Sequence, residues 1–195
     1  MNSENNKKPS FSAILMYCII GVSAVTCTVC FVLYYASILK TAVILWTGIT
    51  CFTIMYHLWL RIIMGNVTKL FRVSYKSHWF REKTFESKLY SFLRVKNWKG
   101  KTLTYNPELY DVKNRTLTQI ADTTAKSELD HWVNVLIALS SILFGLIWGQ
   151  IWIFALTAFL AALFDSHFIV IQRYNRPRLI RLIKKQSRKA PATAG

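Results

Sequence analysis

Two residues three positions apart carry the side chains of an acid–base pair. Glu128 and His131 lie in the stretch AKSELDHW, which reads as part of a helix, and positions i and i+3 share one helical face. A carboxylate beside an imidazole raises its basicity and fixes its tautomer, as a general base requires when it takes a proton from a hydroxyl. We therefore predict Glu128 and His131 as catalytic residues, while Asp130 falls on another face. The competing interpretation is a salt bridge at a helix start, without chemistry.

The same E-x-x-H spacing occurs in helical bundles that hold two metal ions. Those sites need a second carboxylate–histidine set on another helix. The other histidines are His57, His78 and His167, and none of them lies in such a motif. We therefore predict no metal site.

A second polar cluster directly follows an apolar run, in the stretch FIVIQRYNRPRLIRLIKKQSRK. Pro177 disfavours helix just before it, so we expect the helix to kink or end there and a short basic helix to begin near Arg178. Simple anchoring at a membrane surface explains the distal cations Arg181, Lys184, Lys185, Arg188 and Lys189. Anchoring does not explain amides and a tyrosine, and guanidiniums bind phosphates in a fixed geometry. We therefore predict a substrate-binding set of Gln172, Arg173, Tyr174, Asn175, Arg176 and Arg178.

Long runs without charge surround these residues. Met16–Leu39 and Thr41–Leu60 contain no charged residue, and neither does Trp132–Phe164, which is long enough for two helices joined by a turn. A membrane-spanning helix needs about 20 apolar residues. We therefore predict an all-α integral membrane protein with a single membrane domain over residues 1–195. Its four transmembrane helices are expected in two hairpins, near residues 12–37, 42–64, 131–148 and 151–171.

The distribution of charge predicts the orientation in the membrane. The chain has 25 Lys and Arg against 9 Asp and Glu, and the turns inside the two hairpins carry only Lys40. The positive-inside rule then places both termini, the middle region 65–130 and the basic tail 172–195 in the cytoplasm. The first apolar run is too long for the core of a signal peptide, so we expect a retained helix. The basic residues border apolar spans, which excludes a nucleic-acid-binding module.

The middle region 65–130 contains two further expected helices. Aromatic residues recur at helical spacing among the lysines and arginines of residues 78–101, which favours a helix lying in the membrane interface. Asp122 or Thr123 is expected to cap a helix that runs into the third span. The four cysteines all lie in the first two spans, where packing is favoured over metal or disulfide roles: Cys18, Cys27, Cys30 and Cys51.

Three blocks in fixed order carry a resemblance to a known family. They are RVKNWK (Arg94–Lys99), AKSELDHW (Ala125–Trp132) and IVIQRYNRPRL (Ile169–Leu179). Together they resemble the glycosyl-4,4'-diaponeurosporenoate acyltransferases, bacterial membrane proteins of carotenoid biosynthesis. The chain departs from the family at residues 165–167, where Asp-Ser-His replaces an expected Asn-x-Pro.

The resemblance implies a membrane acyltransferase that moves a fatty acyl chain to a sugar hydroxyl of a glycosylated carotenoid or related glycolipid. The implied partners are the bilayer, the lipid acceptor and an acyl donor, either acyl-coenzyme A or an acylated carrier protein, with no cofactor. Trp98 and Lys99 of the first block then join the predicted substrate-binding set. The alternative is a non-catalytic membrane protein that binds anionic lipid or a protein partner, for which a polarised histidine has no evident use.

Overall fold

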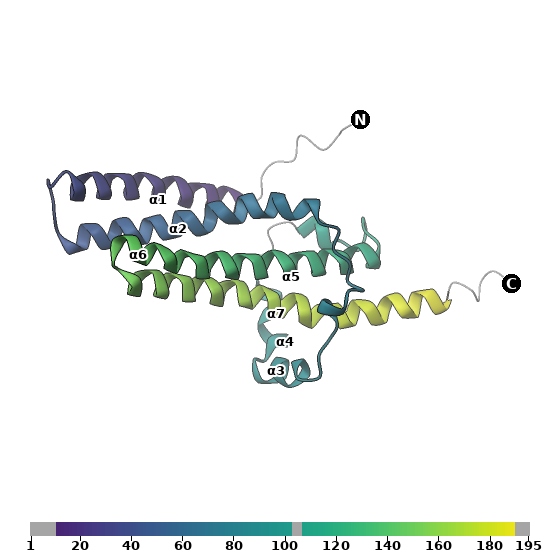
Figure 1. The fold of residues 1–195 in the computed structure, drawn as a ribbon. Helices are drawn as coiled ribbons and strands as arrows, with labels where there is room; N and C mark the ends of the chain where they lie inside the picture. Colours follow the sequence, from purple (N-terminus) through teal and green to yellow (C-terminus); the bar gives the residue numbers. More distant parts are fainter. Residues whose placement is uncertain (1–10, 103–106, 190–195) are drawn as a thin grey trace, which may run out of the picture.

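The structure, a computed structural model, describes residues 11–102 and 107–189. In this part of the chain all regular elements are helices, and four of them are long and apolar enough to cross a membrane. These helices lie side by side in two packed pairs (Figure 1), which confirms the predicted fold class. They are α1 (Phe11–Tyr35), α2 (Ala42–Val67), α5 (Leu117–Ser140) and α7 (Ile151–Lys189). Lys7, Lys8, Asn106 and residues 190–195 of the expected tail lie outside the described residues.

The first hairpin joins α1 to α2 through the turn at residues 36–41. Thr41 begins α2 as its N-cap, and its side chain accepts a hydrogen bond from the amide of Ile44. The two helices approach closely at Gly48, where an added Cβ would lie 3.0 Å from the ring of Phe31 and 3.2 Å from Cβ of Cys30. Cys30 is therefore a packing residue at a close helix–helix contact.

The second hairpin turns sharply between α5 and α7. After α5 the chain tightens through η5 (Ser141–Phe144) and the short helix α6 (Gly145–Trp148). Gly149 ends α6 in the left-handed region with φ +67°, which glycine adopts at no steric cost. A Cβ on Gly145 would lie 2.8 Å from Cγ1 of Ile151. These two glycines let α7 fold back directly against α5.

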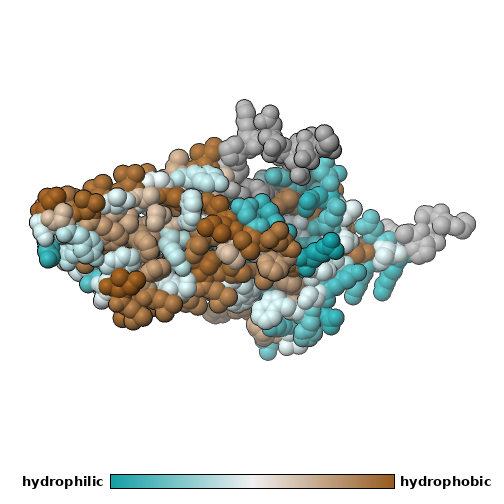
Figure 2. Space-filling model, turned by 45° about the horizontal axis from the view of Figure 1, so that its top comes forward, coloured by the Kyte–Doolittle hydropathy of each residue, from teal (hydrophilic) through white to brown (hydrophobic). Residues whose placement is uncertain are grey.

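The two hairpins meet in an apolar core near their turns. Leu45 and Ile49 of α2 pack against Ile153 and Phe154 of α7, and five partly buried aromatic residues surround them: Phe31, Tyr34, Phe52, Phe144 and Trp148. Apolar residues also cover the outside of this end of the bundle, whereas hydrophilic residues gather at the opposite end (Figure 2). The chain is thus a multi-pass membrane protein with one polar end, as the hydropathy predicts.

The middle region does not form the long interfacial helix that the aromatic spacing predicts. It folds into η1 (Thr68–Leu70), η2 (His78–Phe80), α3 (Glu86–Phe92), α4 (Val95–Trp98), η3 (Lys99–Lys101) and η4 (Pro107–Tyr110). The helix is interrupted because Phe80 turns inward beneath a buried arginine, whereas Phe92 is 84% exposed. The short helices α3 and α4 lie beside α7 (Figure 1).

The predicted N-cap of the third membrane-spanning helix is wrong. The helix begins at Leu117, and Thr116 and Gln119 form a reciprocal capping box before it. Asp122 instead accepts a hydrogen bond from the amide of Tyr75 and so holds the chain that follows α2.

The predicted break at Pro177 is also wrong, because α7 runs without interruption from Ile151 to Lys189. Proline removes one helical hydrogen bond and its ring crowds the preceding turn. Here the arginines just before it, Arg173 and Arg176, are tied to neighbouring segments, and these contacts hold the turn in place. The basic residues after Pro177 therefore continue the helix of the fourth span instead of forming a separate one.

Candidate functional site

A histidine–carboxylate pair joins α5 to α7 where their apolar halves end. Nδ1 of His131 lies 2.8 Å from Oδ1 of Asp165, which is 1% exposed. The ring of His131 stacks on that of Phe168, with centroids 4.7 Å apart and planes 5° from parallel. Because the carboxylate occupies Nδ1, it holds the tautomer in which Nε2 accepts a proton. Among the described residues, no hydrogen-bond partner meets Nε2, and the side chain is 20% exposed.

Two further polar side chains complete the surroundings of Asp165. Arg61 of α2 forms an ion pair with its other oxygen, and the amide of Asn134 donates to Oδ1 at 3.3 Å. The guanidinium of Arg61 lies over the ring of Phe164, 5.4 Å from its centroid. The buried carboxylate is therefore held between a guanidinium and an imidazole, so that it orients His131.

The sequence predicts that Glu128 orients His131. In the structure Glu128 belongs instead to a separate buried cluster. Its two oxygens lie 2.7 Å from Nε of Arg173 and 2.7 Å from Nη1 of Arg176. Arg173 also forms an ion pair with Glu86 of α3 and donates to the carbonyl of Trp79. His131 therefore meets Asp165 and not Glu128, because the face of α5 that carries Glu128 meets the arginines of α7.

The second arginine of this cluster is fully enclosed. Arg176 is 1% exposed, and its donors reach Oγ1 and the carbonyl of Thr124 and the carbonyl of Phe80. Its guanidinium also lies 5.1 Å from the centroid of the Phe80 ring. With so many donors satisfied by the protein, Arg176 has no surface to offer a phosphate. Its position favours a structural link between α7, α5 and the 78–86 segment.

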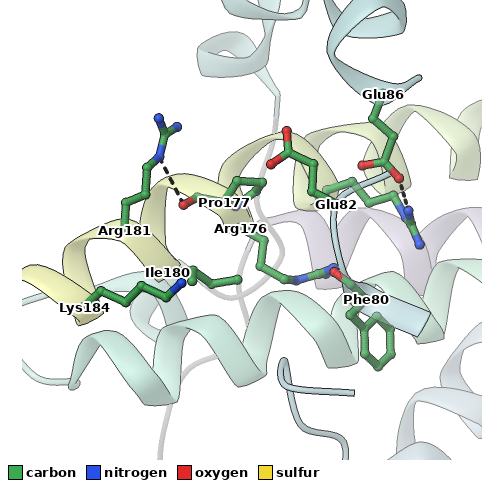
Figure 3. A pocket seen from close by; sticks show the side chains of 9 residues that line it. Phe80, Glu82, Glu86, Arg176, Pro177, Ile180, Arg181 and Lys184 are labelled. Atoms are coloured by element: carbon green, nitrogen blue, oxygen red, sulfur yellow. Dashed lines mark hydrogen bonds and ion pairs between the residues drawn. The ribbon is translucent and has the colours of Figure 1, made fainter. Parts of the chain in front are cut away.

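A pocket of about 320 Å³ lies above this cluster, between the 80–86 segment and α7 (Figure 3). Arg173 and Arg176 line it together with the carboxylates Glu82 and Glu86. Next to Glu86, burial and the hydrogen bond that Tyr90 donates to that carboxylate raise the pKa of the Tyr90 phenol. Tyr90 therefore stays a neutral donor, and the carboxylate of Glu86 is committed to Tyr90 and Arg173.

The remaining members of the predicted substrate-binding set gather on a different face of α7. Nζ of Lys99 donates to Oδ1 of Asn175 at 2.8 Å and lies 4.6 Å from the centroid of the Tyr174 ring. Burial and the nearby Arg178 lower the pKa of Lys99. Lys99 and Arg178 therefore form a pair of neighbouring cations. Trp98 stacks on His167, with centroids 4.3 Å apart.

A row of aromatic rings lies between the Lys99–Arg178 pair and His131. His167 meets the edge of Phe168 at 5.5 Å, and Phe168 is the residue on which His131 stacks. Oγ1 of Thr102 lies 3.0 Å from Nε2 of His167 and fixes that ring. The row Trp98–His167–Phe168–His131 therefore crosses α7 at residues 167–168, between α4 and α5. Gln172 lies outside it, buried against the hydroxyl of Tyr110.

Sequence reasoning missed Asp165, Arg61 and Asn134. Two of them had a detectable signal: Arg61 is the first charge after the apolar run of α2, and Asp165 is the first after the run that ends at Phe164. Charges that border apolar runs lie at similar depth in a membrane and are costly without partners. Pairing them by depth would have found the ion pair, whereas nothing in the sequence marks Asn134.

One comparison with known proteins identifies the family. Residues 76–185, more than half of the chain, match the sequence model of the family described as glycosyl-4,4'-diaponeurosporenoate acyltransferase. No curated protein and no solved structure matches the chain. The match contains all three sequence blocks, His131 and the aromatic row, whereas Arg61 lies outside it. This protein therefore belongs to the glycosyl-4,4'-diaponeurosporenoate acyltransferase family, membrane acyltransferases that act on glycosylated carotenoids.

Proposed function

We propose that the protein transfers a fatty acyl chain from an acyl thioester to a sugar hydroxyl of a glycosylated carotenoid or related glycolipid, with His131 as general base. The observation that carries this proposal is the pairing of His131 with Asp165. It leaves Nε2 of a partly exposed imidazole to accept a proton at the membrane boundary. Family membership supplies the reaction class, and the geometry supports the role of the residues.

In the proposed reaction, Nε2 of His131 takes the proton of the sugar hydroxyl while the hydroxyl oxygen attacks the thioester carbonyl carbon. The tetrahedral intermediate then collapses, the carbon–sulfur bond breaks, and the thiolate takes the proton from Nε2. The products are the sugar ester and the free thiol, and the imidazole returns to its starting state. Asp165 acts as a positioning residue that stabilises the transient imidazolium. This step needs no covalent acyl-enzyme.

The place of His131 suits a lipid-linked sugar. The apolar tail of the acceptor would lie in the bilayer beside the apolar halves of α5 and α7, and its sugar would then emerge where those halves end. With the cytoplasmic orientation proposed from the charge distribution, this boundary faces the compartment in which acyl thioesters are made.

Lys99 and Arg178 are proposed to hold the phosphate of the thioester donor. They lie near each other on the face of α7 that continues to His131, and Asn175 fixes the ammonium of Lys99. This assignment moves the proposed phosphate site away from Arg173 and Arg176, whose donors contact protein groups. Both acyl-coenzyme A and acylated carrier protein present such a phosphate.

The test is acyl transfer in vesicles that contain the purified protein, a glycosylated carotenoid and an acyl thioester. His131→Ala is expected to lower the rate by about 10²–10⁴-fold, the usual contribution of acid–base catalysis. The matched control is His78→Ala, because His78 is an exposed histidine of the same polar end. Full activity of His131→Ala, with normal expression, would refute His131 as the base, whereas absence of transfer by the unmodified protein would favour the non-catalytic alternative.

A further inference from the structure

The cytoplasmic half of α7 carries a row of cations on one face. Arg178, Arg181, Lys185 and Arg188 follow one another at spacings of three, four and three, which keeps them on one side of a helix, and Lys184 borders them. All five are exposed. The apolar Leu179, Ile180 and Ile183 on other sides are half-buried. We refer to the five cations as the cationic face.

The bilayer does not account for this face. The apolar run of α7 ends at Ile171, and at 1.5 Å per residue Lys184 and Arg188 lie about 20 and 26 Å beyond it. The headgroup layer is roughly 5–8 Å thick, and salt screens exposed charges within about 8 Å. The positive-inside rule counts cations near a span but does not place them on one face. The distal cations are therefore presented to a partner in the cytosol.

Among the described residues, no carboxylate forms an ion pair with the cationic face. In the described part of the chain none of its five members forms an ion pair, and the guanidinium of Arg181 donates instead to the carbonyl of Pro177. Glu82 is the carboxylate across the pocket from Arg181 and Lys184 (Figure 3). Neighbouring like charges on a helix destabilise it slightly. A partner that is acidic over an extended surface matches this charge.

The distance from this face to His131 matches the length of a known acyl donor. Arg178 lies ten residues after Phe168, on which His131 stacks, so helical rise separates them by about 15 Å. A phosphopantetheine arm is roughly as long as five extended residues, or about 17 Å. A phosphate held by Arg178 and Lys99 would therefore let the arm run along α7, so that the thioester reaches His131 beside Phe168.

We propose that the cationic face binds an acidic acyl carrier protein, whose phosphopantetheine arm extends from Arg178 and Lys99 along α7 to His131. This inference rests on the proposed acyl transfer and adds the identity of the donor. Acyl-coenzyme A has the same arm and phosphate but no acidic protein surface. Only the carrier protein would use the cations beyond Arg178.

The experiment compares two donors in vesicles with the full-length protein. One is an acylated carrier protein, and the other is acyl-coenzyme A with the same acyl chain. The variant reverses four charges, Arg181→Glu, Lys184→Glu, Lys185→Glu and Arg188→Glu. The control reverses four exposed cations elsewhere: Lys69→Glu, Lys83→Glu, Lys88→Glu and Lys113→Glu. The two proteins then have equal net charge.

For the carrier-protein donor, the four reversals on the cationic face are expected to lower kcat/KM by about 10–10³-fold, the range of electrostatic steering. The loss should shrink as salt is added, and kcat should change little. With acyl-coenzyme A, kcat/KM should stay within about threefold of the unmodified protein. The control variant should keep its rate with both donors.

Several results would overturn the proposal. Equal losses of kcat/KM with both donors would mean that the cationic face is needed for folding or binds the phosphates of any donor. A loss that appears only in vesicles with anionic lipid, and not in neutral vesicles, would assign the face to lipid. Equal losses in variant and control would mean that only net charge matters.

Failure of the acyl transfer itself would be recognised separately. If neither thioester is used by the unmodified protein, co-flotation of the carrier protein with vesicles still tests docking. If the four charge reversals abolish binding of the carrier protein, the docking interface would be supported even though the acyl transfer is not. Equal binding to all variants would refute the interface.

Discussion

Replacing Glu128 by glutamine separates the structural role of this residue from the catalytic role that the sequence suggests. The carboxylate is fully buried and lies 2.7 Å from Nε of Arg173 and 2.7 Å from Nη1 of Arg176. A glutamine of the same shape accepts through one oxygen, but its amide N–H₂ then faces a guanidinium donor. Breaking a buried ion pair costs about 3–5 kcal/mol because it leaves an uncompensated charge. At about 2–4 °C per kcal/mol for a chain of this size, the unfolding midpoint should fall by roughly 6–20 °C.

The assay is thermal unfolding of the purified protein in detergent, measured together with acyl transfer well below the midpoint. Glu82→Gln is the matched control, since Glu82 is an exposed carboxylate beside the same arginines, and its effect should stay within about 0.5 kcal/mol. For Glu128→Gln we expect the midpoint to fall while the folded fraction keeps most of its activity. An unchanged midpoint with activity reduced by about 10²-fold or more would refute this reasoning and restore Glu128 as the partner of His131.

Three further predictions address the phosphate site, the hairpin turn and the orientation. Because burial and Arg178 lower the pKa of Lys99, its charge is lost at a lower pH than that of an ordinary lysine, so KM for the thioester should begin to rise earlier as pH increases, and Lys99→Arg should delay that rise. Gly145→Val should destabilise the protein by about 1–3 kcal/mol in thermal unfolding, whereas Gly21→Val, with open space around it, should not crowd a neighbour. A single cysteine in place of Lys40 should react with a membrane-impermeant maleimide added to intact cells, whereas one in place of Lys96 should react only after lysis.

The membrane-spanning part of the fold could be predicted because hydropathy and charge act locally. The runs without charge gave the four long helices, and the glycines near residue 149 mark the tight second turn. The segment over 78–101 was mispredicted because helical spacing of aromatics does not reveal which of them turn inward. Phe80 is buried by its contact with Arg176, a residue 96 positions away. Local pattern carries no information about such a contact.

The candidate site was predicted in its residue types but not in its pairings. The spacing of Glu128 and His131 predicts that they share one face of α5. Both contact α7, but α7 presents two arginines to Glu128 and Asp165 to His131. Which residue meets which depends on how far α5 is shifted along α7. The E-x-x-H motif does not encode that shift, and the hairpin turn fixes it only approximately.

The buried ion pairs fix the position of α5 along α7. Apolar contacts between two helices tolerate a slide by one turn, about 5.4 Å, because similar side chains recur at that spacing. The ion pairs of Glu128 do not tolerate it, since a slide would leave two guanidiniums without their carboxylate in the interior. The same shift that pairs Glu128 with Arg173 and Arg176 also brings His131 to Asp165. We therefore propose two roles for the arginine-rich block: its inward residues fix the alignment of the helices that the proposed base requires, and its outward Arg178 binds the donor phosphate.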